Sequence, residues 1–291
     1  MQLARICLGG ITPRHSLFPP RCPGAIMQTH GSRQDSPFGE TSIDLLLVCG
    51  ARPDLISRTL ESFSRRVIPN FGIARVFANI DRFQGGKAEV AAVQERVLAF
   101  FPAAEIRTPE SPSFTKAVAW LWGCIASPYA LHLEDDWLAH ADIGEGDVLP
   151  YFNGPVRQVS ILTVEKNWKS RYPFHCAWER RRFLGVEFGR RLYPDRPLFT
   201  TSPSFVEREF ARTCSRLMDP SLDPEKQLYD NRNVALSSYT SSFQNRIIGG
   251  RNPYWIEDIG RADRDRRGTR KVIAGGQSHW IGNEAADRTE Q

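Results

Sequence analysis

The sequence has no run of about 18 apolar residues, the length at which a segment becomes a candidate membrane-spanning helix. The apolar stretch at residues 6–11 is too short for the core of a signal peptide. The six cysteines form no CxxC pair and no cluster with histidine, which argues against a zinc site and a disulfide framework. Scattered free thiols are typical of a reducing compartment. We therefore expect a cytoplasmic protein.

The sequence also lacks a strong excess of charge of either sign. It has 38 basic and 33 acidic residues, a net charge of +5, with the basic residues spread along the chain. Such a diffuse balance does not indicate a nucleic-acid partner. It suits a small anionic ligand, and it leaves room for peripheral contact with an acidic membrane surface.

The first 40 residues have little apolar periodicity and contain five prolines. This composition predicts a disordered or loosely packed arm over residues 1–40, in which Met27 is an alternative start. The remainder, residues 41–291, is expected to form one domain. Residues 41–140 make its ligand-binding half, and residues 141–291 make a second half that ends in a lid.

Strand and helix patterns alternate through residues 43–133. Buried-strand patterns occur at residues 43–49, 74–80, 104–108 and 129–133, and helix patterns follow the first three of them, opening at Pro53, Gly86 and Ser113. This β-α-β order predicts an α/β fold whose mostly parallel sheet carries helices on both faces. Such sheets bind ligands beyond the carboxyl ends of their strands.

The pattern loosens after Asp147. We expect a strand at residues 156–164 and two helices, opening at Ser202 and Asp223, each with a capping residue followed by proline. The stretch 168–193 is rich in aromatic residues and arginine but has no clear period. The tail from Arg251 is expected to be a loop with one extended piece near residues 271–273.

Three adjacent carboxylates, Glu134, Asp135 and Asp136, directly follow the fourth predicted strand. Their mutual repulsion and their burial would raise their pKa values. A Mn²⁺ or Mg²⁺ ion removes this conflict, because these hard cations prefer carboxylate and phosphate oxygens. A solvated acidic turn is the alternative interpretation, but the position at a strand end favours a metal site.

The segment L-H-L-E-D-D-W resembles the DxD motif of GT-A glycosyltransferases, particularly the inverting family 2. Glu134 follows Ile43 by 91 residues, a spacing similar to that of the family, although Asp is commoner at the first acidic position. The resemblance implies a Rossmann-like GT-A fold and a hexosyltransferase activity that uses a nucleoside diphosphate sugar. It also implies that Asp136 binds the metal, with Glu134 nearer the ribose or a metal-bound water and Asp135 beside the donor.

The same resemblance assigns residues around the nucleotide. Cys49, Gly50 and Arg52 occupy the place of the family's nucleotide-facing segment but lack its Pro and Tyr. Asp81 matches the carboxylate that meets the base. Lys116 matches a basic residue that steadies the donor, although an ordinary surface lysine fits equally well.

In the second half, the resemblance implies a general base at a helix start about ninety residues after the DxD motif. Glu225 lies 89 residues after Asp136, with Asp223 as its substitute, and both also fit ordinary helix-start chemistry. His279 is a candidate further metal ligand, as in some GT-A enzymes. Arginines between residues 258 and 271 could fold over the donor diphosphate.

Taken together, these residues predict metal-dependent transfer of a sugar from a nucleoside diphosphate sugar to a glycan, lipid or small hydroxyl acceptor, with inversion. A sugar-phosphate nucleotidyltransferase remains open, although G-A-R-P-D is a poor version of its triphosphate loop. A non-catalytic module that binds nucleotide sugars also remains open.

Overall fold

The computed structural model describes residues 41–164, 166, 172–183, 186–229, 231–274 and 277–282, with side chains as far as residue 268. The predicted arm at residues 1–40 lies outside the described residues, so the domain boundary at residue 41 stays a prediction. In the described part of the chain, no helix is both long and apolar enough to cross a bilayer.

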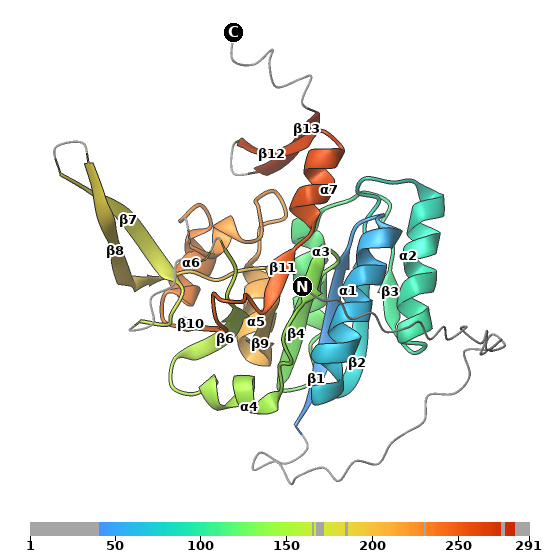
Figure 1. Ribbon diagram of the computed structural model, residues 1–291, viewed down its shortest axis with the longest axis horizontal. Helices are drawn as coiled ribbons and strands as arrows, with labels where there is room; N and C mark the ends of the chain where they lie inside the picture. Colours follow the sequence, from blue (N-terminus) through green and yellow to red (C-terminus); the bar gives the residue numbers. More distant parts are fainter. Residues whose placement is uncertain are drawn as a thin grey trace, which may run out of the picture. The chain divides into compact units, whose positions relative to one another are not determined.

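A seven-stranded sheet forms the centre of the fold, in the order β10-β6-β9-β4-β1-β2-β3 (Figure 1). Neighbouring strands pair in parallel except at β9, which is antiparallel to both β4 and β6. The predicted α/β class with a mostly parallel sheet is therefore confirmed. The sheet strands are β1 (Ser42–Cys49), β2 (Gly72–Ile80), β3 (Glu105–Arg107), β4 (Tyr129–Glu134), β6 (Val156–Ile161), β9 (Ser204–Glu207) and β10 (Gln244–Ile248).

Helices cover both faces of this sheet. On one face α1 and α2 share a core cluster with Leu45 and Leu47 of β1. On the other face α3 and α5 share a second cluster with Leu46 and Val48 of the same strand. A strand that is buried on both faces is a nearly continuous apolar run in the sequence, as residues 43–49 of β1 are. The helices are α1 (Pro53–Arg66), α2 (Lys87–Phe100), α3 (Phe114–Cys124), α4 (Glu145–Val148), α5 (Arg208–Leu217), α6 (Val234–Thr240) and α7 (Gly260–Arg266).

The helix predicted to open at Ser202 is wrong. The chain instead forms β9, whose Phe205 and Val206 are fully buried between β4 and β6. Helix α5 starts only after it, at Arg208, where the Glu207 carboxylate accepts hydrogen bonds from the backbone N–H groups of Glu209 and Phe210. Pairing in the middle of a sheet outweighed the local capping signal.

The helix predicted to open at Asp223 is also wrong, although its capping chemistry is present. Asp223 Oδ1 accepts hydrogen bonds from the backbone N–H groups of Glu225 (3.0 Å) and Lys226 (3.1 Å). Only a single 3₁₀ turn follows, Lys226–Leu228. The Gln227 side chain bonds back to the backbone of Asp219, which folds this segment into a compact loop.

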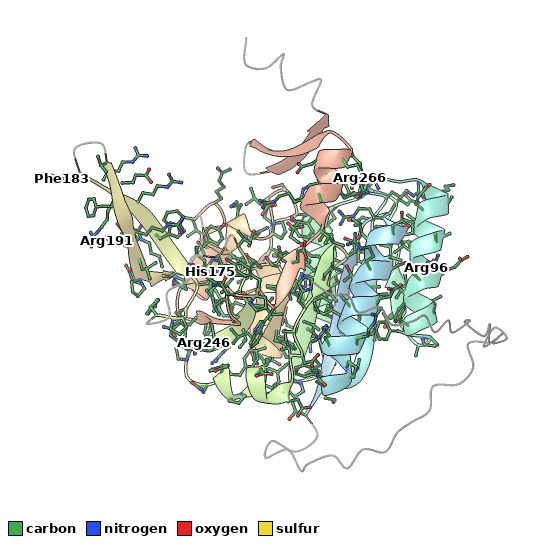
Figure 2. All side chains as sticks on the ribbon, in the orientation of Figure 1. Arg96, His175, Phe183, Arg191, Arg246 and Arg266 are labelled. Carbon is green, nitrogen blue, oxygen red and sulfur yellow. The ribbon has the colours of Figure 1, made fainter. Side chains whose placement is uncertain are left out.

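Two regions contain more regular structure than the sequence predicts. The stretch without a clear period contains an antiparallel hairpin, β7 (Cys176–Phe183) and β8 (Val186–Pro197), which stands away from the central sheet (Figures 1 and 2). The tail predicted to be mostly loop contains β11 (Ile256–Asp258), α7, β12 (Thr269–Ala274) and β13 (Gln277–Gly282). Strand β11 pairs with β5 (Trp137–Ala139), directly after the acidic cluster, so the tail returns to the predicted site.

Candidate functional site

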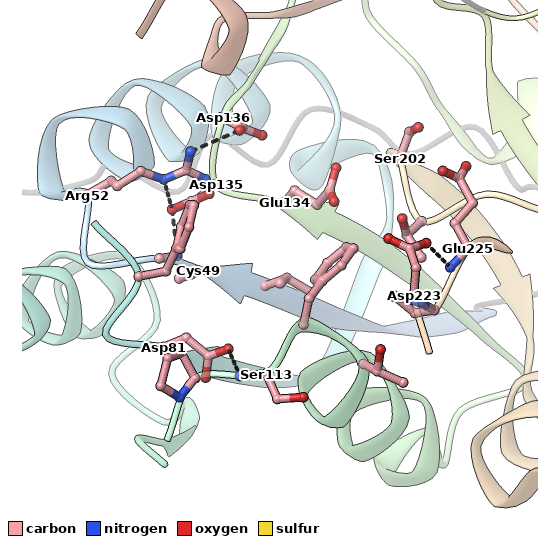
Figure 3. Close-up of a pocket in the computed structure, with 18 of the residues that line it drawn as sticks. Cys49, Arg52, Asp81, Ser113, Glu134, Asp135, Asp136, Ser202, Asp223 and Glu225 are labelled. Atoms are coloured by element: carbon pink, nitrogen blue, oxygen red, sulfur yellow. Dashed lines mark hydrogen bonds and ion pairs between the residues drawn. The ribbon is translucent and has the colours of Figure 1, made fainter. Parts of the chain in front are cut away.

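A cavity of about 690 Å³ lies at the carboxyl ends of β1, β2 and β4. Its lining includes Cys49 at the end of β1, Asp81 after β2 and Glu134 at the end of β4 (Figure 3). Because β9 runs in the opposite direction, the residues before it, Thr201 and Ser202, reach the same edge. The volume falls in the range of about 300–1,000 Å³ that is usual for small-molecule sites. The fold thus gathers most of the predicted residues, though not Lys116 or His279, where parallel sheets bind ligands.

Asp135, the middle residue of the acidic cluster, points into the protein and is almost fully buried. Its Oδ2 accepts hydrogen bonds from the backbone N–H of Gly50 (2.8 Å) and from Arg52 Nε (3.2 Å), and its Oδ1 accepts one from Arg52 Nη2. Both carboxylate oxygens are therefore engaged by the segment that follows β1. Asp135 holds that segment in place, and the other two acids are left for a ligand.

Arg52 is the positive charge at the centre of the acidic cluster. Besides its bonds to Asp135, its Nη1 lies 3.2 Å from Asp136 Oδ2. Burial alone lowers the pKa of this guanidinium, but the charges of Asp135 and Asp136 raise it by more, so the net shift is upward. Arg52 precedes Pro53, the first residue of α1, so the helix start fixes its position. The sequence predicts a nucleotide contact at Arg52 and gives no sign of this ion pair, which spans 83 residues.

Asp136 lies between Arg52 and the N-terminal end of α7. Burial, followed by the charge of Asp135, raises the pKa of Asp136 to about 6, against the opposing effect of Arg52. Its backbone oxygen accepts a hydrogen bond from the N–H of Ile259 (2.9 Å), and Arg264 Nη1 of α7 lies 3.9 Å from its carboxylate. The C-terminal tail thus closes over this carboxylate, and Arg264 also lines the cavity.

Glu134 is the third acid and lines the cavity beside Asp136 (Figure 3). Its Oε2 accepts a hydrogen bond from the indole Nε1–H of Trp137 (3.0 Å), which orients the carboxylate. Burial, with the charges of Asp136 and Glu225, raises the pKa of Glu134 well above its usual value. The crowding of charge that the sequence predicts is therefore present in this fold.

The donor atoms fit a divalent cation only in part. Among the described residues, no group of three or more His, Cys, Asp or Glu side chains is placed to hold a metal ion. Glu134 and Asp136 are two hard carboxylate donors at the cavity, since Asp135 is occupied by Gly50 and Arg52. Mg²⁺ is commonly held by one or two carboxylates together with substrate phosphates. The site fits Mg²⁺ or Mn²⁺ when a diphosphate completes the shell.

Asp81 forms another wall of the same cavity. Its Oδ1 accepts from Asn79 Nδ2 (2.9 Å) and its Oδ2 from the backbone N–H of Ser113 (3.0 Å). Burial raises the pKa of Asp81, while these two hydrogen bonds oppose the shift. Each oxygen of this carboxylate accepts one of these hydrogen bonds and has capacity for another. The ring of Phe83 and Pro112 add apolar surface to the same cavity.

Glu225 and Asp223 line the wall opposite Asp81 (Figure 3). Asp223 is buried and its Oδ1 is engaged by the turn, whereas Glu225 is partly exposed. Lys166 is a buried cation near this wall, and its Nζ donates to the backbone oxygen of Ile161 (3.0 Å). Burial lowers the pKa of Lys166 to about 8, and the charges of Glu225 and Glu134 partly oppose this. Of the two acids, Glu225 is the freer to meet a ligand.

Four sequence-predicted positions have no free donor or acceptor shown at the cavity. Cys49 and Gly50 line the cavity, but burial, followed by the charge of Asp135, raises the pKa of the Cys49 thiol, and the Gly50 N–H is committed to Asp135. Lys116 is exposed on α3 and does not line the cavity. The side chain of His279, in β13, lies outside the described residues, so its predicted metal contact stays a prediction.

Gly260, Lys166 and Thr201 were missed by the sequence reasoning. Gly260 begins α7 against Asp136, and an added Cβ would lie 2.1 Å from Asp136 Oδ2. No local signal marks this glycine, since it lies in an unremarkable stretch, D-I-G-R. Glycine is required at position 260 because of its contact with Asp136, which lies more than 120 positions earlier in the chain. The basic tail near Arg264 was the sole sequence hint that this segment reaches the site.

We expect Gly260→Ala to destabilise the protein. Alanine in place of glycine inside a helix ordinarily stabilises by roughly 0.5–1 kcal/mol. Here the new methyl group collides with the Asp136 carboxylate, and overpacking costs about 1–3 kcal/mol. Thermal unfolding measures the sign. Gly146→Ala is the matched control, because an added Cβ in α4 meets nothing within 4 Å. Equal or higher stability for Gly260→Ala would show that α7 does not pack on Asp136.

Comparison with known proteins gives similarities of fold only. No protein-family model and no curated protein sequence matches this chain. Among solved structures it is similar to GalNAc-T7 with UDP, GalNAc and Mn²⁺ (12% identity, TM-score 0.49, covering 71% of this chain and 43% of that one). It is also similar to the mannosyltransferase PcManGT from Pyrobaculum calidifontis in complex with GDP-Man and Mn²⁺ (13% identity, TM-score 0.41, covering 70% and 54%).

A third similar structure is CMP:2-keto-3-deoxy-manno-octonic acid synthetase complexed with CTP (12% identity, TM-score 0.42, covering 77% of this chain and 96% of that one). The match spans about half the length of GalNAc-T7 and of PcManGT. At these identities and TM-scores the neighbours assign neither substrate nor activity to this chain. Its function has to be argued from the cavity.

Proposed function

We propose that this protein transfers a sugar from a nucleoside diphosphate sugar to a hydroxyl acceptor, with the help of Mn²⁺ or Mg²⁺. The observation that carries the proposal is the composition of one cavity at the strand ends. Its walls are an anchored carboxylate at Asp81, two crowded carboxylates at Glu134 and Asp136, and a partly exposed carboxylate at Glu225. These three groups match the three parts of the reaction: base binding, diphosphate binding and deprotonation of the acceptor.

In this proposal the donor takes the following orientation in the cavity. The nucleobase lies beside Asp81, whose lone pairs accept from a ring N–H, and beside the flat surface of Phe83 and Pro112. The diphosphate lies at Asp136 and Glu134, which would hold the metal ion. The ion would neutralise the negative charge of the leaving phosphates. Arg264 completes this charge balance from the tail, because its guanidinium already lies near Asp136. The sugar then extends towards Ser202 and Glu225 (Figure 3).

Glu225 acts as the general base. Its carboxylate accepts the proton of the acceptor hydroxyl as that oxygen attacks the anomeric carbon. The bond from this carbon to the diphosphate breaks, and the nucleoside diphosphate leaves with the electron pair. Attack from the side opposite the leaving group inverts the anomeric centre. Asp223 keeps Glu225 in place through the turn, and the acceptor is a glycan, a lipid or a small hydroxyl compound.

A panel of nucleotide sugars tests this function. The protein is incubated with UDP-, GDP- and CMP-linked sugars and Mn²⁺, and the release of free nucleotide is followed with and without EDTA. We expect metal-dependent release of a nucleoside diphosphate from at least one donor. Formation of pyrophosphate from a nucleoside triphosphate and a sugar phosphate would instead indicate a nucleotidyltransferase. Binding of a donor without any turnover, with acceptors of all three kinds present, would indicate a non-catalytic module.

A further inference from the structure

Over most of its length, the β7–β8 hairpin is not covered by any other described part of the chain. From Glu179 to the end of β7, and over the first six residues of β8, every described side chain is exposed. The strands pair with each other from Cys176 and Pro197 to Phe183 and Val186, with register shifts between Cys176 and Ala177 and between Arg181 and Arg182. An isolated two-stranded ribbon is at best marginally stable in water. A ribbon with both faces exposed indicates a surface that is completed by something outside this fold.

The end of the ribbon is apolar. Phe183, Val186 and Phe188 are 68%, 68% and 60% exposed. In the described part of the chain, six large hydrophobic residues are exposed, and these three lie within six positions of one another. Scattered exposed apolar residues are normal, whereas a cluster of this kind marks an interaction site. Figure 2 shows Phe183 at the end of the ribbon, away from the central sheet.

Arginine surrounds this apolar end on both faces of the ribbon. Alternation along β7 puts Arg180 and Arg182 on one face and Arg181 on the other, and Arg190 and Arg191 of β8 continue the two faces. The ribbon carries six arginines and three acidic residues, so it is basic overall. Glu187 neutralises part of one face, since its carboxylate lies 3.0 Å from both Arg180 Nη1 and Arg182 Nη2.

Aromatic rings hold some of these arginines in place. The guanidinium carbon of Arg190 lies 4.0 Å from the centroid of Trp178, and that of Arg191 lies 5.1 Å from the centroid of Tyr193. Stacked guanidinium groups remain charged and are less free to move. The positive charge is thus presented at fixed places behind the apolar end.

We propose that the end of the β7–β8 hairpin docks on an anionic membrane surface. Phe183, Val186 and Phe188 enter the boundary between headgroups and acyl chains, and the arginines on both faces contact anionic headgroups. Apolar burial and attraction of basic residues to anionic lipid add to each other in this geometry. A plane of negative charge satisfies arginines on both faces of a ribbon at once. The same hairpin end of a second copy would bring apolar side chains together but would place arginines of the same charge against each other.

Vesicle sedimentation tests the proposal without any need for activity, so its outcome is separate from that of the proposed function. The full chain is sedimented with vesicles of phosphatidylcholine alone and with vesicles of equal parts phosphatidylcholine and phosphatidylglycerol. We expect binding to the anionic vesicles, weaker binding to the neutral ones, and loss of binding as salt screens the arginines. No binding to anionic vesicles, or equal binding to both kinds, would overturn the proposal.

Two variants locate the contact on the hairpin. The triple change Phe183→Ser, Val186→Ser, Phe188→Ser should weaken anionic-vesicle binding by roughly tenfold or more, because it removes the apolar contribution. Val234→Ser is its control, since Val234 is 71% exposed on α6. Arg181→Gln with Arg191→Gln should weaken binding to the anionic vesicles and make the remaining binding less sensitive to salt. The exposed Arg96→Gln on α2 is its control.

The melting temperature of each variant shows whether the fold is kept, and the single change Phe183→Ser replaces the triple one if it is not. If the triple variant is folded and binds anionic vesicles as strongly as the wild type does, the proposal is overturned. A second result would also overturn it. If the wild type binds no vesicles, and light scattering shows a dimer for the wild type but a monomer for the triple variant, the end of the hairpin joins two copies instead.

Discussion

Glu225→Gln is expected to slow sugar transfer by about 10²–10⁴-fold while donor affinity stays near that of the wild type. Glutamine keeps the shape and the hydrogen-bonding reach of the side chain but cannot accept the proton of the acceptor hydroxyl. Glu225 is the freer of the two acids on its wall of the cavity, because Asp223 is buried and caps the turn. The effect should therefore appear in the rate of turnover and not in binding.

Asp223→Asn is the matched control for this experiment. The amide retains an oxygen that can accept from the N–H groups of Glu225 and Lys226, and Asn caps about as well as Asp. Transfer rate, donor affinity and melting temperature are measured for both variants. Near-normal transfer by Glu225→Gln would remove Glu225 from the mechanism. Inactivity of Asp223→Asn at an unchanged melting temperature would move the base to Asp223.

The first half of the fold could be predicted from the sequence because its signals are local. In residues 43–134 strands β1 and β4 are short, mostly apolar runs, and the helices start at recognisable positions, such as Pro53 or Ser113. Parallel strands joined by helices then leave few possible topologies. The position of the acidic cluster at the end of β4 follows from the same reasoning.

The second half could not be predicted in this way because its elements depend on distant partners. Strand β9 forms because β4 and β6 both pair with it, although the Ser202–Pro203 pair that precedes it is also typical of a helix start. The arginine-rich β7 lacks the apolar alternation of a half-buried strand, since neither face of its outer part is covered. A strand that is exposed on both faces has no alternation of apolar and polar residues by which the sequence could reveal it.

The same limit applies within the site. The residues alone identified Glu134, Asp135 and Asp136 as a group, and separate roles came only from the resemblance to GT-A glycosyltransferases. In the structure the three acids differ because of Arg52, which engages both carboxylate oxygens of Asp135, and because of the tail, which brings Gly260 and Arg264 against Asp136. Each of these contacts joins residues more than 80 positions apart.

Asp136→Asn is expected to weaken metal-dependent nucleotide binding by at least about 100-fold. Removal of a partner of a metal ligand typically costs 10–100-fold in metal affinity, and loss of a direct carboxylate donor should cost no less. The amide fills the same space beside Gly260, so the fold should be kept. Asp142→Asn is the control, because that carboxylate is exposed and pairs with Arg66 at the surface.

A normal affinity for the nucleotide in Asp136→Asn, at an unchanged melting temperature, would exclude Asp136 as a metal ligand. The cavity would then have Glu134 as its one free carboxylate at the diphosphate. Arg52 could, in that case, turn from Asp136 towards the phosphates, and Arg52→Lys would become the variant with the larger effect on affinity.

Calorimetric titration of the wild-type protein with UDP and with GDP, in Mn²⁺ and in EDTA, tests the central claim most directly. The cavity at the strand ends is proposed to bind a nucleoside diphosphate through a metal held by Glu134 and Asp136. We predict saturable binding of at least one of the two nucleotides in Mn²⁺ and its loss in EDTA. Binding of equal affinity in both conditions, or no binding of either nucleotide, would contradict this account.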